Sequence, residues 1–201
     1  MQIQRKGMLL IVSGPSGAGK GTLTDMLMAE DDSIVFSISA TTRAPREHEI
    51  PDVHYHFLTP ETFSRLVQED AFLEHAQVHG NCYGTLKSEV EERLAQGQNV
   101  LLDIDTQGAL NVMKKMPDCV SVFIYPPSMQ TLRQRLIDRG TETSESLALR
   151  LRNAWGEVAQ AGHYQYVIVN DDKETAYRQL RSIVNAEKQR GSRFSVTLEE
   201  N

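Results

Sequence analysis

The sequence contains little cysteine, no excess of positive charge and no long apolar run. Its 201 residues include only two cysteines, Cys82 and Cys119, which are too few for a disulfide scaffold and fit no metal-binding spacing. The formal net charge of −6 argues against a general nucleic-acid binder. No stretch approaches the about 20 apolar residues that a membrane-spanning helix needs. We therefore expect a cytoplasmic globular protein with reduced thiols and without nucleic-acid or membrane partners.

Short apolar runs alternate with helical patterns along the chain. The runs occupy residues 8–12, 100–104, 120–125 and 166–169. Such continuous runs are typical of strands covered on both faces. The first run is too short for a secretory signal and leads directly into a glycine-rich loop. Helical patterns cover residues 22–29, 88–95, 107–115 and 175–189. This alternation predicts an α/β fold, with a parallel sheet in a three-layer α/β/α core.

Two segments interrupt the alternation and divide the predicted core. The first, 37–86, is richer in Thr, Pro, His and Tyr, with one predicted helix at 60–69. The second, 127–163, reads as a helical hairpin that carries several arginines. Both leave the core at the end where α/β sheets bind ligands. We expect them to be inserted substrate-binding and lid subdomains. The core then comprises 1–36, 87–126 and 164–201, ending in a frayed polar tail at 191–201.

Residues 14–22 read GPSGAGKGT and combine the features of a phosphate-binding loop. Gly14, Gly19 and Lys20 have the spacing G-x-x-x-x-G-K between a predicted strand and a predicted helix, which is the context that the motif requires. Backbone N–H groups wrap the phosphates in such loops, and the lysine neutralises the β- and γ-phosphates. The complete context disfavours a plain connecting turn. We expect a nucleoside-triphosphate site formed by Gly14, Pro15, Ser16, Gly17, Ala18, Gly19, Lys20, Gly21 and Thr22.

The residue after Lys20 departs from the usual form of the motif. Gly21 stands where a hydroxyl normally reaches the metal, and Thr22 follows one residue later. Magnesium dehydrates reluctantly, so it can be held by phosphate oxygens, water and carboxylates elsewhere. Asp103 and Asp105 end a predicted buried strand, where alternation puts both side chains on one face. We expect Mg²⁺ as the cofactor, supported by Thr22, Asp103 and Asp105, in part through water.

The segment SISATTRAPR, residues 37–46, offers a second anion site. Arg43 and Arg46 lie three residues apart around a proline, and two arginines can clamp a phosphate with bidentate geometry. In the other insertion, Arg135 and Arg139 are four residues apart and share one helix face, with Arg150 across the predicted hairpin. Solvated surface charge is the alternative reading of these three helical arginines.

The chain resembles guanylate kinase over residues 7–188. The sequence motifs that carry the resemblance are GPSGAGKGT, SISATTRAPR, FLEHAQ, GNCYGT, LDIDTQG, PPS, RGTET and VIVNDD. The resemblance implies ATP-dependent phosphorylation of GMP, and of dGMP. It also identifies GKGT as a subtype found in some nucleoside-monophosphate kinases. Two departures are Cys82, where an aromatic is common, and the turn EHEIPD, which lacks the glycines often seen there.

The resemblance also implies roles for individual residues. In the family, the GMP phosphate is held by the residues that match Arg43, Arg46, Tyr55 and Tyr83. The guanine base is read by the residues that match Ser39, Glu74, Thr85 and Asp105. In the family, the arginines that match Arg135, Arg139 and Arg150 close on the triphosphate. The resemblance therefore implies that these three residues are catalytic, together with Lys20 and Arg43. Asn170 is placed near adenine by resemblance only.

No general base is expected, because the attacking GMP phosphate oxygen is already ionised at neutral pH. The histidines lack a matching third ligand, which disfavours a zinc site. Two alternatives stay open at this point. One is a P-loop kinase for another monophosphate, and the other is a catalytically inactive protein-binding module of the same fold. The sequence leaves the oligomeric state open.

Overall fold

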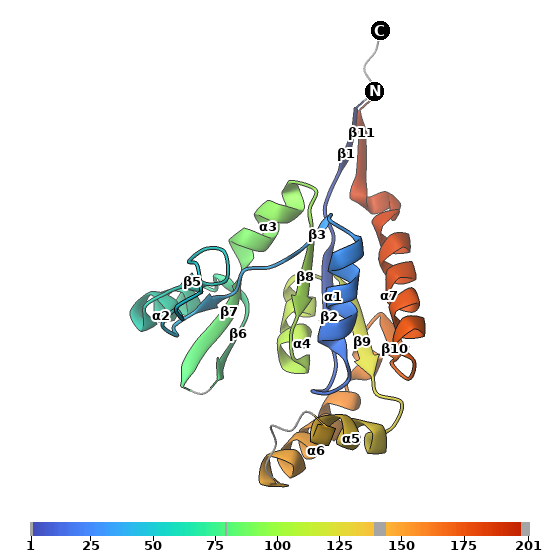
Figure 1. Ribbon diagram of the computed structural model, residues 1–201. Helices are drawn as coiled ribbons and strands as arrows, with labels where there is room; N and C mark the ends of the chain where they lie inside the picture. The colour runs from blue at the N-terminus through green and yellow to red at the C-terminus, as the bar shows by residue number, and fades with distance from the viewer. Residues whose placement is uncertain (1, 79, 139–143, 198–201) are drawn as a thin grey trace.

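The core of the molecule is a five-stranded parallel sheet (Figure 1). The computed structural model describes residues 2–78, 80–138 and 144–197. Strands follow the order β10 (Tyr166–Val169), β9 (Val120–Tyr125), β2 (Leu9–Ser13), β8 (Asn99–Asp103) and β3 (Ile34–Phe36). All neighbouring strands are parallel. Four of the five strands are the predicted apolar runs, to within one residue at each end, and β3 was not predicted.

Helices cover both faces of this sheet. On one face, α1 (Lys20–Glu30) and α7 (Lys173–Lys188) pack against Leu10 and Val12 of β2. On the other face, α3 (Lys87–Ala95) and α4 (Thr106–Lys115) pack against Leu9 and Ile11. Successive residues of β2 therefore face opposite layers, which explains its unbroken apolar run. The predicted three-layer α/β/α core is confirmed. None of the helices in the described part of the chain is long and apolar enough to cross a membrane.

A separate four-stranded sheet lies within the first insertion. Its order is β5 (His56–Phe57), β4 (Ala40–Thr41), β7 (Asn81–Leu86) and β6 (Phe72–Val78). The helix α2 (Pro60–Gln68) covers it, capped by the Thr59 side chain with Pro60 in its first turn. The stacked rings of Phe63 and Phe72, 4.5 Å apart, form the centre of a small apolar core of its own. This sheet projects from one side of the core in Figure 1.

The turn that leads into β5 uses an aspartate where the backbone is left-handed. Asp52 has φ 62, and its carboxylate Oδ1 lies 2.8 Å from His56 Nδ1. Aspartate tolerates this backbone region better than most side chains. The glycine-poor turn EHEIPD therefore still makes a left-handed turn, at Asp52.

The second insertion is the helical hairpin that the sequence predicts. It consists of α5 (Met129–Asp138) and α6 (Ser144–Val158), which bury Leu132, Leu136 and Ala154 between them. A short 3₁₀ turn, η1 (Ala161–His163), returns the chain to β10. The hairpin lies beyond the end of the sheet where β2 and β9 finish.

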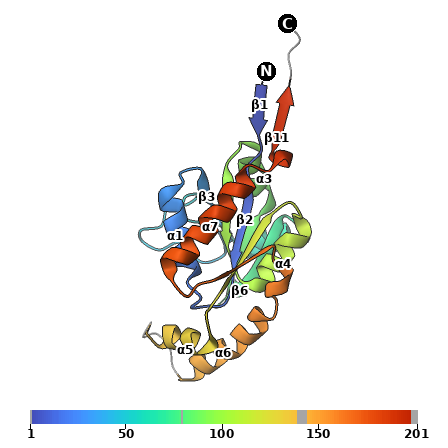
Figure 2. The same ribbon diagram turned by 90° about the vertical axis from the view of Figure 1, so that its right-hand side faces the viewer.

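The chain ends form a two-stranded antiparallel ribbon, which the sequence did not predict. β1 (Gln2–Arg5) pairs with β11 (Phe194–Thr197), after the 3₁₀ turn η2 (Gly191–Arg193). The expected frayed tail is wrong for residues 191–197, because 191–193 form η2 and 194–197 pair with the N-terminal strand. Figure 2 shows this ribbon at the end of the core opposite to α5 and α6. The ribbon is thus remote from the phosphate loop.

Candidate active site

The phosphate loop (residues 14–19) joins the central strand β2 to the start of α1. Gly19 is the N-cap of α1 and has φ 94, a left-handed conformation that favours glycine. A Cβ atom at Gly19 would overlap Nδ2 of Asn170. Asn170 is buried after β10, and its Nδ2 donates a 2.7 Å hydrogen bond to the carbonyl of Ala18. Asn170 therefore braces the loop from within, while its expected contact with adenine stays a prediction.

Substitution of Gly19 by alanine should disrupt the loop. The new Cβ would meet Asn170, and a left-handed backbone costs a non-glycine residue about 1–3 kcal/mol. We expect the KM for ATP to rise by about 10-fold or more, with a lower melting temperature. Steady-state kinetics and thermal denaturation check this. Gly191→Ala is the matched control, since Gly191 lies in η2, remote from the loop, and a Cβ there would meet nothing within 4 Å. Equal effects at the two glycines would contradict the proposed bracing.

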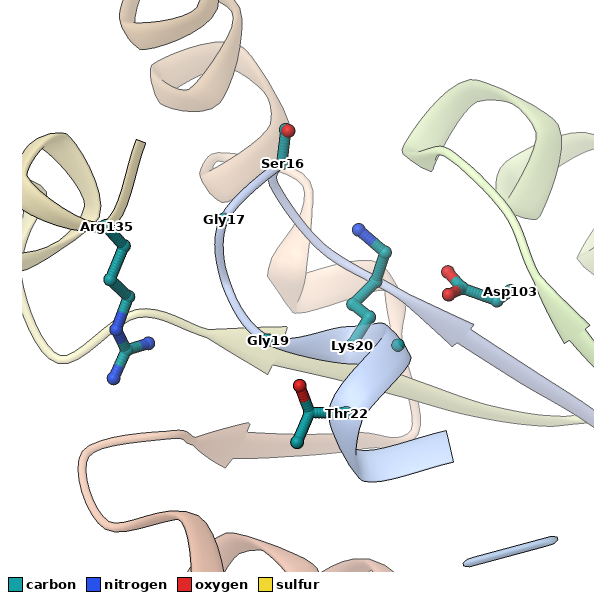
Figure 3. Close-up of a pocket in the computed structure, with 8 residues that line it drawn as sticks. Ser16, Gly17, Gly19, Lys20, Thr22, Asp103 and Arg135 are labelled. Atoms are coloured by element: carbon teal, nitrogen blue, oxygen red, sulfur yellow. The ribbon is translucent and has the colours of Figure 1, made fainter. Parts of the chain in front are cut away.

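A cavity of about 400 Å³ opens beside this loop. Lys20, Thr22, Asp103 and Arg135 line it together with loop residues (Figure 3). Nζ of Lys20 donates to the carbonyl of Gly14 at 2.7 Å, so the lysine folds over the loop. Burial raises the pKa of Asp103, and the positive charge of Lys20 partly opposes that shift. The cavity thus places a lysine and a carboxylate where a triphosphate and a cation would meet.

Two arginines of the hairpin contact the phosphate loop. Arg135 of α5 donates from Nη2 to the carbonyl of Asn170 at 2.9 Å and from Nη1 to the carbonyl of Ala18 at 3.5 Å. Arg150 of α6 donates from Nη1 to Ser16 Oγ at 2.9 Å. Arg139 lies outside the described residues. The structure therefore brings Arg135 and Arg150 to the loop from different helices, with Arg135 half-buried and Arg150 exposed to solvent.

The two aspartates expected to support magnesium lie in different surroundings. β8 ends at Asp103, so strand alternation does not extend to Asp105. Asp105 is the N-cap of α4, and its Oδ1 accepts a 2.8 Å hydrogen bond from the Gly108 N–H. It lines a second cavity, of about 630 Å³, between α4 and α6. Because Asp105 lies beyond the strand, the shared face expected from alternation stays a prediction. Only Asp103 lines the cavity of Lys20.

Three of the expected base-reading residues gather between the two sheets. Thr85 Oγ1 donates to Glu74 Oε1 at 2.7 Å. A Cβ on Gly108 would lie 3.3 Å from Glu74 Oε2 and 3.6 Å from Asp105 Oδ1, which places both carboxylates at the first turn of α4. Burial raises the pKa of Glu74, and the negative charge of Asp105 adds to the rise. Ser39 is half-buried, and its carbonyl accepts from the His56 N–H at 3.0 Å.

Three of the expected phosphate-holding residues lie together at the four-stranded sheet, Tyr83 within β7 and Arg43 and Tyr55 just outside β4 and β5. The Arg43 guanidinium is 5.4 Å from the centre of the Tyr55 ring. The rings of Tyr55 and Tyr83 are 6.2 Å apart and meet edge to face. Hydrogen bonding to Glu49, and further to Tyr83, raises the pKa of Arg43. The fourth residue, Arg46, is exposed and lies in the adjoining turn.

Two acidic residues near these groups were not predicted. Glu49 contacts Arg43 and the main chain of Arg46. Glu157 of α6 lines the second cavity with Asp105. Burial raises the pKa of Glu157, and the positive charge of Lys20 opposes only part of that rise. Neither has a motif signal, because a glutamate in a polar turn or on a polar helix usually faces solvent.

These features define the class of protein. A glycine-rich loop between the central strand of a parallel sheet and a helix, with a lysine and hairpin arginines around it, defines a P-loop kinase of a small substrate.

Comparison with known proteins identifies the family. The family model for guanylate kinase matches residues 6–187. A guanylate kinase of Clostridium perfringens (strain 13 / Type A) is 51% identical over 193 residues, which cover 96% of this chain and 89% of that protein. A guanylate kinase of Carboxydothermus hydrogenoformans is 47% identical, with 96% of both chains covered. The crystal structure of guanylate kinase from Anaplasma phagocytophilum has a TM-score of 0.71 and 35% identity, covering 96% of this chain and 92% of that chain. The chain belongs to the guanylate kinase family, whose members phosphorylate GMP with ATP.

Proposed function

We propose that this enzyme phosphorylates dGMP as well as GMP, with Mg²⁺–ATP as the donor, at a site centred on the end of β8. The observation that carries the proposal is that Asp103, the last residue of β8, and Asp105, two residues later, line two different cavities. Asp103 lines the cavity of Lys20, whereas Asp105 lies beside Glu74 at the start of α4. The donor cavity and the base-reading cluster are therefore only two residues apart along the chain. Direct transfer between two bound nucleotides requires such proximity.

On the donor side, the main chain of residues 14–22 would wrap the triphosphate at the N-terminus of α1. Lys20 would neutralise the β- and γ-phosphates as charge moves, and Arg135, Arg139 and Arg150 would stabilise the transferring group. The contacts of Arg135 and Arg150 with the loop support this assignment. The acceptor oxygen of the monophosphate is already ionised, so these groups act by position and charge without a general base.

On the acceptor side, guanine presents two adjacent donors, N1–H and the N2 amino group, beside the O6 acceptor. The Glu74 carboxylate would accept from both donors, while Thr85 and Ser39 supply hydroxyls and Asp105 completes the pocket. Thr85 already donates to Glu74, which supports a fixed carboxylate. The phosphate would lie against the cluster of Arg43, Arg46, Tyr55 and Tyr83. None of these proposed contacts needs a ribose 2′-hydroxyl, which is why we include dGMP.

The residues around the loop fit a magnesium ion. The Asp103 carboxylate and the Thr22 hydroxyl line one cavity with Lys20, and oxygen donors of this kind suit a hard cation. Asp105 would contribute only through water, since it lines a different cavity. When bound, the ion would neutralise charge on the β- and γ-phosphate oxygens. Asp103 would orient it, while the remaining positions belong to phosphate and water.

The chain would work as three parts. We propose that 37–86 and 127–163 are mobile subdomains around a core of 1–36, 87–126 and 164–201. Separate apolar clusters in the four-stranded sheet and in the α5–α6 hairpin support this division. Closure of both parts over two nucleotides would exclude water and suppress ATP hydrolysis. A cytoplasmic setting fits the thiols, because burial raises the pKa of Cys119 to about 11 and keeps it protonated.

A coupled ADP-release assay with four acceptors tests the proposal. At millimolar ATP and Mg²⁺ we expect turnover of GMP and dGMP, with kcat/KM for AMP and CMP lower by about 10⁴-fold. Chelation of the metal should abolish turnover of both guanine nucleotides. Failure of dGMP alone would remove the dGMP assignment. Turnover that persists without a divalent cation would remove the role of Asp103.

A further inference from the structure

The turn after the proposed phosphate-holding arginines carries a carboxylate that joins both of them. Glu49 Oε1 accepts from Arg43 Nη2 at 2.7 Å, and Glu49 Oε2 accepts from the Arg46 main-chain N–H at 2.7 Å. The Glu49 N–H in turn donates to the Arg46 carbonyl at 3.0 Å, which closes the turn. Both oxygens of one carboxylate are thus used within the proposed site.

Arg43 is held on several sides. Besides Glu49, its Nη1 donates to the carbonyl of Ala44 at 2.7 Å. The guanidinium lies 5.4 Å from the ring centre of Tyr55 and 5.9 Å from that of Phe57. A guanidinium has five N–H donors, so donors remain for an anion after its bonds to Glu49, Ala44 and Tyr83. Contacts of this kind fix its plane before any nucleotide binds.

We propose that Glu49 is the positioning residue of the acceptor-phosphate site, holding Arg43 and the turn at Arg46 in the orientation that receives the monophosphate. This inference rests on the proposed roles of Arg43 and Arg46. Glu49 does not touch the phosphate; it acts through Arg43, whose remaining N–H groups face the anion. A guanidinium misplaced by 1 Å would lose bidentate geometry, which is the interaction that favours arginine over lysine at phosphates.

The charge state of Glu49 suits this role. Hydrogen bonding to Arg43, and next to the Arg46 N–H, lowers the pKa of Glu49 to about 2. The carboxylate is therefore ionised throughout the range of a kinase assay, and its effect on GMP binding should not vary with pH there. Its side chain is 15% exposed, whereas Glu47 in the same turn is exposed.

A competing role predicts the opposite sign. If the Glu49 carboxylate occupied the place of the phosphate, GMP would have to displace it. Removal of the carboxylate would then lower the KM for GMP. A positioning role predicts that removal raises that KM, because Arg43 becomes free to adopt unproductive rotamers.

Steady-state kinetics of Glu49→Ala and Glu49→Gln test the proposal, with both substrates varied. For Glu49→Ala we expect the KM for GMP to rise by about 10- to 100-fold, while kcat and the KM for ATP change less than about threefold. Glu49→Gln should recover part of the loss, because its amide oxygen still accepts one hydrogen bond. Glu47→Gln, in the same turn, is the matched control and should behave as the parent enzyme.

Each other outcome has a distinct meaning. An unchanged or lowered KM for GMP in Glu49→Ala overturns the positioning role, as does a parallel rise in the KM for ATP. Arg43→Ala separates this inference from the proposed function. If Arg43→Ala raises the KM for GMP and Glu49→Ala does not, only the inference fails. If Arg43→Ala has no effect, the proposed phosphate site itself fails.

Discussion

Lys20→Met is expected to lower kcat by about 10³-fold, with a smaller change in the KM for ATP. Methionine keeps an apolar stem of similar length and removes the charge together with the N–H donors of the ammonium group. Nζ of Lys20 lies against the loop carbonyls of Gly14 and Pro15, at 2.7 and 3.4 Å, and lines the cavity with Asp103. The charge is needed most when the phosphoryl group moves, so its loss should affect kcat more than ground-state binding.

The measurement is steady-state kinetics at saturating GMP, and the control is Lys114→Met. Lys114 is an exposed lysine in the last turn of α4 and touches none of the proposed site. The Lys114→Met substitution should leave kcat unchanged. A Lys20→Met enzyme with kcat within tenfold of the parent would contradict the role of this lysine in transfer. A matching loss in Lys114→Met would point to general loss of charge.

Strands that are buried on both faces were the part of the fold that the sequence predicted best. Because β2 packs against helices on both sides, all of its residues are apolar except Ser13, and the run is visible without knowledge of the fold. β4 and β5 have two residues each, too short for any periodicity. β1 and β11 are short, mix polar and apolar residues and are mostly exposed, so their pairing is determined by tertiary proximity of the chain ends.

The residues of the candidate site also differ in whether a local sequence pattern predicts them. Gly19 and Lys20 belong to a contiguous motif, so spacing alone predicts where they lie. The brace from Asn170 to Ala18 joins residues 152 positions apart, and no local pattern signals it. Asp103 and Asp105 were assigned one face because alternation was extended past the strand end. Asp105 is instead the N-cap of α4 and lines a different cavity, which strand alternation does not signal.

Glu74→Gln is expected to lower kcat/KM for GMP by about 10³-fold and to leave the KM for ATP nearly unchanged. An amide at this position offers one acceptor where guanine presents two donors, and its NH₂ group would face one of them. The amide is nearly isosteric and keeps an oxygen for the hydroxyl of Thr85, so the pocket should retain its shape. Kinetics with varied GMP and varied ATP measure the split. Glu91→Gln, an exposed change on α3, is the control. Unchanged GMP kinetics would remove Glu74 from the base pocket.

The same substitution should make the protein more stable at neutral pH. Burial raises the folded-state pKa of Glu74 above that of an ordinary glutamate, so the folded state binds this proton more tightly than the unfolded state. Stability therefore falls as pH rises from the unfolded pKa through the raised folded one, so ionisation of this buried carboxyl group is destabilising. Glu74→Gln removes that penalty, and we expect a rise in melting temperature of about 1–4 °C at pH 7. The gain should vanish below the unfolded pKa, where Glu74 is protonated in both states. If Glu74 served only to pack the interior, its substitution would make the protein less stable. Loss of GMP turnover together with a gain in stability would therefore identify Glu74 as a ligand-binding group.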